Sequence, residues 1–329
     1  MTEILLTEST GNATVDQVLR DTVDVFEAAF PGRVRGYYVE GSYAGATGVA
    51  TSDVDLSIVF VDAFQDGEAA RARQLAEACR LLSAVELDIG MDDEAAWRAG
   101  LPPALKLAAR LVYGTETRDR FPLVPLAAWT RDRMHTSYWR MVHLFGRPAM
   151  IAPPLGYPDP DDEFYGYLRH TVHLPDGREV PCTRDLIRLT GWAATGLLAR
   201  EADVYVARKR NCHRLYRLHI GDTWTDLLDS IYEECCTAWH YLVPADPAPR
   251  LRLREICAQT LAFENSFLAR YKTFLPAELG GTDPAGIREA QRVLQRIPYQ
   301  DAEVVRTLAA VAEGHILDAD DSDRESVLQ

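Results

Sequence analysis

The chain has 329 residues, of which 47% are hydrophobic and 26% charged, a balance typical of a globular protein with about two domains. Its formal net charge of −14 disfavours binding to nucleic acid, because such binding depends on Lys and Arg neutralising phosphates. No run approaches the roughly 18 to 20 apolar residues of a membrane span, and the start, MTEILLTEST, lacks the layout of a signal peptide. We therefore expect a cytoplasmic protein that favours cationic partners.

The first 122 residues are predicted to form an α/β domain. Apolar residues at helical spacing predict helices over residues 15–30, 67–83 and 95–110. Short apolar or alternating runs predict strands over residues 34–41, 52–61 and 84–91, and the run RLVYG follows the last helix. Strands and helices thus alternate along this part of the chain, which is typical of a sheet flanked by helices.

The pattern changes at residue 123, and residues 123–316 are predicted to form an all-α helical domain. One exception is a β-hairpin near residues 168–181, where two short runs surround Pro-Asp-Gly. Beyond a helix that begins at a Thr183 N-cap, helical spacing covers residues 203–219, 223–242, 249–273, 284–295 and 300–314. Residues 317–329 are acidic and lack periodicity, so they are expected to form a disordered tail.

Carboxylates stand two residues apart in two of the predicted strands. Asp53 and Asp55 share one face of the second strand, because strand side chains alternate between faces. Two such carboxylates repel each other unless a cation lies between them, and hard oxygen ligands suit Mg²⁺. Glu86 and Asp88 share a face of the next strand, so a third carboxylate can join the first two. This set predicts a magnesium site for phosphoryl or nucleotidyl transfer, with two ions expected.

A Gly-Ser pair follows the first predicted strand. Gly41 lets the backbone approach a phosphate closely, and Ser42 can offer its hydroxyl and N–H to a triphosphate at the start of a helix. The pair and the acids together predict a nucleotide-binding site.

The segment EGSYAGATGVATSDVDL resembles the nucleotidyltransferase signature of the DNA polymerase β superfamily. In that signature a hydrophobic-Gly-(Gly/Ser) turn is followed, nine to thirteen residues later, by Asp-hydrophobic-(Asp/Glu)-hydrophobic. The pairs Gly41 and Ser42, and Asp53 and Asp55, fill its functional positions. The resemblance implies an α/β nucleotidyltransferase domain with a mixed sheet, Mg²⁺ as cofactor, and transfer of a nucleotide to a hydroxyl.

Within the superfamily, the chain resembles the streptomycin/spectinomycin type of aminoglycoside adenylyltransferases, which carry a C-terminal helical bundle and confer antibiotic resistance. The segment AVELDIGMDDEAAW is similar to their third strand, in which a Glu is the catalytic base, and Glu86 would occupy that place. Asp88 competes for the role, because other members carry an Asp followed by alternating apolar residues. The resemblance implies transfer of AMP from ATP to a small cationic acceptor with release of pyrophosphate.

The bundle of such enzymes supplies a Lys or Arg to the phosphates, and one basic segment of this chain is the candidate. Arg208 and Lys209 are predicted nucleotide contacts, and Arg210 is predicted to share a helical face with Arg214 and Arg217. A solvated helix face that balances nearby acids is the alternative interpretation.

Two other functions stay open. The same chemistry can serve a macromolecular acceptor, as in toxin-like nucleotidyltransferases that modify tRNA or protein, although the acidic charge disfavours tRNA. A non-catalytic nucleotide-sensing module is the other possibility, and the complete acid set argues against it.

Overall fold

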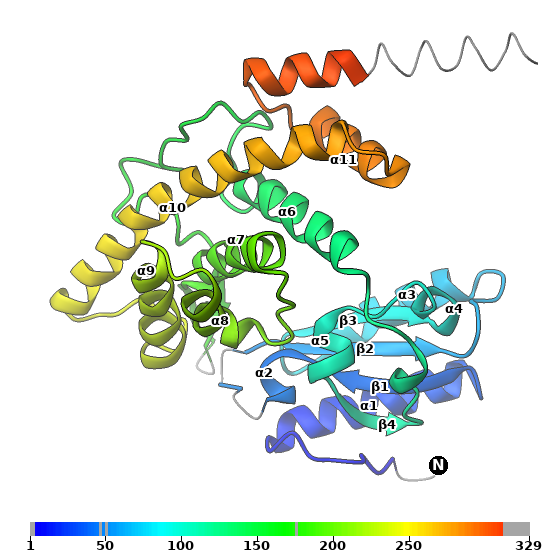
Figure 1. The fold of residues 1–329 in the computed structure, drawn as a ribbon. Coiled ribbons are helices and arrows are strands. Elements are labelled where there is room, and N and C mark those ends of the chain that lie inside the picture. Colours follow the sequence, from blue (N-terminus) through cyan, green and yellow to red (C-terminus); the bar gives the residue numbers. More distant parts are fainter. Residues whose placement is uncertain (1–3, 46–47, 50–51, 175–176, 312–329) are drawn as a thin grey trace, which may run out of the picture. The chain divides into compact units, whose positions relative to one another are not determined.

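The computed structural model describes residues 4–45, 48–49, 52–174 and 177–311, and it forms two compact units (Figure 1). The first unit runs to Trp129 and also contains Val204–Cys212, while the second contains Thr130–Asp203 and the chain from His213 onward. The predicted acidic tail at 317–329 and the last residues of the helix predicted at 300–314 lie outside the described residues.

A four-stranded mixed sheet forms the centre of the first unit. Its strands are β1 (Val34–Val39), β2 (Val54–Phe60), β3 (Leu87–Asp93) and β4 (Arg110–Gly114), in the order β3-β2-β1-β4. β1 is antiparallel to both β2 and β4, whereas β2 and β3 are parallel. This arrangement agrees with the predicted α/β class.

Helices cover both faces of this sheet. α1 (Ala13–Ala29) and α3 (Glu68–Leu82) bury apolar side chains against the face that carries Val39, Leu56 and Leu87. On the other face, α4 (Glu94–Trp97) and α5 (Pro103–Ala108) contribute to a smaller apolar cluster with Tyr38 and Val59. The remaining short helices of this unit are α2 (Gly41–Ala44), η1 (Arg118–Arg120) and η2 (Lys209–Asn211).

The single helix predicted over residues 95–110 is wrong. The structure has α4 and α5 there, separated by Gly100, whose φ of +123° is unfavourable for other residues, and by Pro102. A proline cannot donate the backbone hydrogen bond that a continuous helix needs, so the apolar spacing alone was misleading.

The second unit is mainly helical. Its helices are α6 (Leu126–His143), α7 (Arg184–Ala202), α8 (Cys212–His219), α9 (Thr225–Ser230), the π-helix η3 (Ile231–Ala238), α10 (Pro247–Leu279) and α11 (Pro284–Arg296). The predicted hairpin is present as β5 (Thr171–His173) and β6 (Glu179–Pro181), although its turn residues 175–176 lie outside the described residues. Residues 302–311 are also helical. A helical C-terminal region is therefore confirmed.

Two predicted helices differ from those observed. The helix predicted at 203–219 begins only at Cys212, because Asp203 adopts a left-handed conformation that ends α7 and Arg208 is extended. The helix predicted at 223–242 is divided into α9 and the wider π-helical turns of η3. Thr183 does precede α7, but its hydroxyl donates to the carbonyl of Tyr241 instead of capping the helix.

A buried ion pair ties α10 to a preceding loop of the same unit. Glu264 of α10 is fully buried and pairs with Arg147 through two contacts of 2.5 and 2.8 Å, while Tyr167 donates to it at 2.5 Å. The pair satisfies both oxygens of a carboxylate that would otherwise be costly to bury. Among the described residues, no helix combines the length and apolarity needed to cross a bilayer.

Candidate functional site

Carboxylates from three neighbouring strands lie on one face of the sheet in the first unit. The parallel register pairs Asp55 of β2 with Asp88 of β3, so their side chains share a face. Just beyond the end of β1, the N–H of Glu40 donates to the carbonyl of Asp55 at 2.9 Å, which puts Glu40 opposite Asp55 on the other side. Asp55 is therefore flanked by an acidic residue on each neighbouring strand.

Asp55 has the most perturbed carboxyl group of this set. Burial raises its pKa to about 6, and the negative charges of Asp53, Glu40 and Asp88 act in the same direction, whereas Lys209 opposes them. These groups are therefore close enough to act on one another. A carboxylate in such surroundings is poised to gain from a bound cation.

Gly41 directly adjoins the Asp55 side chain. It begins α2 with a φ of +63°, and a Cβ at this position would overlap Asp55 Oδ2. Both the backbone conformation and the lack of a side chain are thus required here. Ser42, the second residue of α2, has a buried hydroxyl oxygen. The Gly-Ser pair lies next to the acids, as the signature implies.

Glu40 and Ser57 are site residues that the sequence analysis missed. The hydroxyl of Ser57 donates to Glu40 Oε1 at 2.5 Å, which fixes the carboxylate on the acidic face. Burial raises the pKa of Glu40, while Ser57 and the charge of Lys209 oppose that shift. The period of two along β1 gives a signal that was available, since Tyr38 and Glu40 must share one face.

Asp53 and Glu86 both lie at the entrance to their strands. Each precedes the first residue of its strand, and the N–H of Val54 donates to the carbonyl of Glu86 at 2.8 Å. Because Asp55 is level with Asp88 in a parallel pair, the residues two positions earlier are level with each other as well. Asp53 is half-buried, whereas Glu86 is exposed.

Lys209 belongs to the same unit as these acids and reaches them electrostatically. Its charge lowers the pKa of both Asp55 and Glu40. Arg208 precedes η2 in an extended conformation and is exposed. The helical face predicted for Arg210 with Arg214 and Arg217 is wrong, because Arg210 lies in η2 and α8 begins after it.

The acidic residues at the end of β3 and the start of α4, Asp92, Asp93 and Glu94, divide into two roles. Asp93 caps α4 by accepting from the N–H of Ala96, and Glu94 forms an ion pair with Arg35 at 2.8 Å, so both are structural. Asp92 instead lies at the position of β3 that shares the acidic face, and burial raises its pKa. Its negative charge also reaches Glu40.

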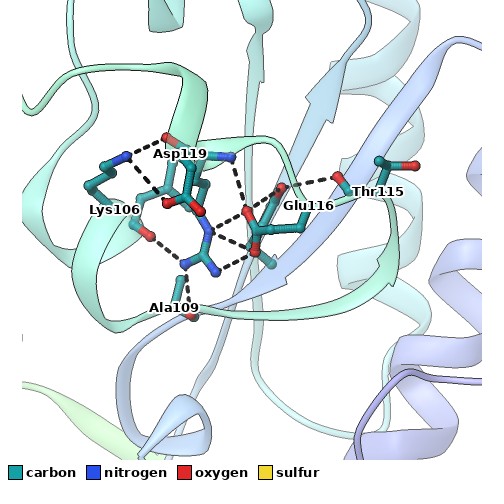
Figure 2. A network of polar contacts seen from close by, with 8 residues as sticks. Lys106, Ala109, Thr115, Glu116 and Asp119 are labelled. Carbon is teal, nitrogen blue, oxygen red and sulfur yellow. Dashed lines mark hydrogen bonds and ion pairs between the residues drawn. The ribbon is translucent and has the colours of Figure 1, made fainter.

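A second polar network supports this face from the side of β4. The guanidinium of Arg118 donates to Glu116 at 2.6 Å, and Lys106 forms an ion pair with Asp119 at 3.8 Å. Figure 2 labels Lys106, Glu116 and Asp119 in this network. The same guanidinium lies 4.8 Å from the ring centroid of Tyr38, and its charge lowers the pKa of Glu40. The network thereby links the loop after β4 to the acidic face.

The donor chemistry of this face fits Mg²⁺, although no ready-made cage is present. In the described part of the chain, no three His, Cys, Asp or Glu side chains converge closely enough to hold a metal ion. Mg²⁺ usually takes only one or two carboxylates and completes its shell with water and substrate phosphates. The carboxylates of Asp53, Asp55 and Asp88 are hard oxygen donors of the kind that such a site uses.

Comparisons with known proteins give a distant likeness at the level of structure. No family model matches the chain, and no curated protein matches it. Among solved structures, it is similar to a spectinomycin adenyltransferase from Enterococcus faecialis that was crystallised with ATP and spectinomycin. The two share 12% sequence identity at a TM-score of 0.43, over 77% of this chain and 98% of the other.

Proposed function

We propose that the protein is a nucleotidyltransferase that moves AMP from ATP to a hydroxyl of a small cationic acceptor such as an aminoglycoside. The observation that carries this proposal is the position of Asp55, level with Asp88 on the parallel strand and in contact range of the Gly41 turn. Acids on adjacent strands beside a glycine turn are what a nucleotidyl transfer site requires, because the phosphates and their cation must meet there.

The residues divide between the phosphates and the cation. Gly41 lets the phosphate tail approach the backbone, and Ser42 donates its hydroxyl to the β or γ phosphate. Asp53 and Asp55, with Asp88 beside them, hold Mg²⁺, which when bound neutralises phosphate charge. Lys209 adds a second positive charge next to Asp55, which favours an anionic nucleotide on an otherwise acidic face.

Glu86 is the proposed base. It is exposed and level with Asp53, so an acceptor hydroxyl can lie between Glu86 and the α-phosphate. Glu86 takes the proton as the acceptor oxygen forms its bond to the α-phosphorus, and the bond to the bridging oxygen breaks. Pyrophosphate leaves with that oxygen. Asp88, which lies next to Asp55, serves the cation in this scheme.

The surplus of carboxylates supports a cationic acceptor. Glu40 and Asp92 lie on the same face as the proposed metal acids, and the cation does not need all of them. Ammonium groups on an acceptor would form charge-assisted hydrogen bonds with such carboxylates.

The test is to incubate the protein with ATP labelled on the α-phosphate, Mg²⁺, and separate panels of aminoglycosides, tRNA and proteins. We expect label on an aminoglycoside, with stoichiometric pyrophosphate. Label on tRNA or protein instead would replace the acceptor class, and no labelled product in any panel would refute the activity.

Variants separate the proposed roles. Asp55→Asn should abolish transfer, because a neutral amide cannot replace the charge that holds the cation. Glu86→Gln should lower kcat with little change in the KM for ATP, whereas Asp88→Asn should raise the Mg²⁺ concentration needed for half-maximal rate. If the two patterns are exchanged, the base is Asp88.

A further inference from the structure

One loop connects the Gly-Ser turn with the metal acids, and Tyr43 stands at its start. Tyr43 follows Gly41 and Ser42 in α2, and Asp53 lies at the other end of the loop, directly before β2. Asp55 is held within β2 by the sheet, whereas the backbone of Asp53 belongs to the loop. The position of Asp53 relative to the Gly-Ser turn therefore depends on how this loop is held.

The ring of Tyr43 lies against that loop. A Cβ built on Gly48 would come within 2.6 Å of Tyr43 Cε1 and 2.9 Å of two further ring carbons. Tyr43 itself is buried in the apolar core, with a relative exposure of 5%. Its hydroxyl donates to the carbonyl of Val49 at 3.5 Å, which is long for a hydrogen bond. The contact is therefore mainly steric, between a ring of the core and a glycine of the loop.

The loop closes into a turn just before Asp53. The N–H of Ser52 donates to the carbonyl of Val49 at 2.8 Å, and the Ser52 hydroxyl accepts from the N–H of Val49 at 3.0 Å. Ser52 is buried and directly precedes Asp53. Burial raises the pKa of Tyr43 and the negative charge of Asp53 raises it further, so the carboxylate lies near the phenol. Contacts thus run from Tyr43 through Val49 and Ser52 to Asp53.

Tyr43 is also bonded to the sheet through its backbone. Arg110 is the first residue of β4 and is level with Val39 of β1. Its guanidinium donates to the carbonyl of Tyr43 at 2.7 Å. Such a bond is charge-assisted and therefore stronger than one between neutral groups. Tyr43 is thus held to β4 by its backbone, and it contacts the loop with its ring.

We propose that Tyr43 is a positioning residue for the transfer reaction, which keeps Asp53 at a fixed distance from the Gly41-Ser42 turn. The inference rests on the proposed function and adds to it a residue that touches neither the nucleotide nor the cation. In that reaction Asp53 and Asp55 hold the cation and the turn holds the phosphates, so their relative position must not change. An aromatic ring suits this role, because it is rigid and fills a large volume.

A residue that only packs in the core would behave differently. Its loss would lower the free energy of unfolding, and the folded protein would keep its dependence on Mg²⁺ and ATP. Loss of a positioning residue changes that dependence in a protein that is still folded. Gly48 separates the two cases, because it is exposed and a side chain added there meets the Tyr43 ring.

The test compares Gly48→Ala, Tyr43→Leu and the double variant in the full-length protein. The core holds the Tyr43 ring in place, so the new methyl group of Gly48→Ala should displace the exposed loop and Asp53 with it. We expect kcat to fall on the order of 10- to 100-fold and the Mg²⁺ concentration for half-maximal rate to rise. The KM for the acceptor and the midpoint of thermal unfolding should stay near those of the parent.

The double variant shows whether the effect passes through the ring. In the Tyr43→Leu background, Gly48→Ala should have little further effect, because the ring that it meets is gone. Tyr43→Phe keeps the ring and loses the hydroxyl, so its kcat should lie between those of the parent and Tyr43→Leu. This variant also serves if Tyr43→Leu does not fold.

Two readouts do not depend on transfer. The amide of Ser52 is protected by the carbonyl of Val49, so its hydrogen exchange should be faster in Gly48→Ala than in the parent. The calorimetric affinity for ATP in the presence of Mg²⁺ should fall about 10-fold, since the cation and the phosphates no longer meet in register. The matched control is Gly156→Ala, in which an exposed glycine with nothing within 4 Å of its Cβ is replaced. It should match the parent in every measurement.

The inference is overturned if Gly48→Ala keeps the parental kcat, Mg²⁺ dependence and Ser52 exchange. It is also overturned if Gly48→Ala has as large an effect in the Tyr43→Leu background as in the parent. Both results leave the proposed function intact. If the parent binds ATP with Mg²⁺ and transfers no nucleotide, the proposed function fails, and the affinities and exchange rates of the same variants decide whether Tyr43 positions Asp53.

Discussion

Replacing Gly41 with alanine should reduce the rate of nucleotide transfer much more than it reduces the stability of the fold. Gly41 has a φ of +63°, and its missing side chain leaves the space that Asp55 Oδ2 occupies. The change therefore introduces two separate costs. One is the left-handed backbone conformation, which is energetically unfavourable for alanine, and the other is displacement of the Asp55 carboxylate.

The two costs have different magnitudes and different readouts. A left-handed conformation costs a residue with a Cβ about 1 to 2 kcal/mol, which should appear as a loss in the free energy of unfolding. The second cost arises because the new Cβ would overlap Asp55 Oδ2, so the carboxylate of Asp55 must shift to make room for it. A misplacement of about 1 Å in a site of this kind costs on the order of 100-fold in rate.

Gly67 supplies the control. It has a φ of +72° at the start of α3, and a Cβ built there has nothing within 4 Å. Gly67→Ala should therefore lose about the same 1 to 2 kcal/mol in urea unfolding and keep its rate of nucleotide transfer. Single-turnover transfer with labelled ATP measures the rate in both variants.

The reasoning would be refuted if Gly41→Ala transferred nucleotide at the parental rate. It would equally fail if Gly67→Ala lost as much activity as Gly41→Ala, because the effect would then come from general destabilisation.

Three further outcomes are expected. Because the pKa of Asp55 is raised to about 6, the native state keeps its proton where the unfolded chain has lost it, so this group's contribution to stability falls as pH rises from about 4 to about 6. Near pH 7, the free energy of unfolding of Asp55→Asn in urea should therefore exceed that of the parent by about 2 kcal/mol, after allowance for solvent screening. This difference should disappear near pH 4, and a difference that does not change with pH would contradict the assignment. Lys209→Ala should raise the KM for ATP roughly 10-fold or more, because a charged donor is lost, while Arg210→Ala should not, as steady-state kinetics of the two will show. Glu264→Gln should cost about 3 to 5 kcal/mol in urea unfolding because it leaves Arg147 buried without its carboxylate, and adding Arg147→Met should restore part of that loss.

In the first unit, the local sequence pattern predicted where the strands lie, but it did not predict how the strands pair. The strands near Val39, Asp55 and Asp88 follow from alternation and from apolar runs, and each was found close to its expected position. The alternation of side chains along a strand also predicted that Asp53 shares a face with Asp55, and Glu86 with Asp88. Which residue of one strand lies beside which residue of the other depends on the register, and a single sequence does not contain that information.

Tertiary context decided the features that were missed. Glu40 reads as the last residue of an ordinary strand, and only the pairing of β1 with β2 brings it to Asp55 and Ser57. Lys209 was expected on a helix of the bundle, whereas its segment joins the first unit. The prolines that follow Gly100 indicated a break in the predicted helix, but the prediction gave more weight to the apolar spacing.

The return of Val204–Cys212 to the first unit has a consequence for how the polypeptide is made. The sheet emerges from the ribosome within the first 114 residues, but the strip that carries Lys209 is synthesised only after α6 and α7. The nascent chain can therefore form its acidic face before Lys209, whose positive charge acts on Asp55 and Glu40, has been synthesised. A gene fragment that stops at Trp129 would therefore encode the sheet without Lys209, and its acidic face would lack that positive charge.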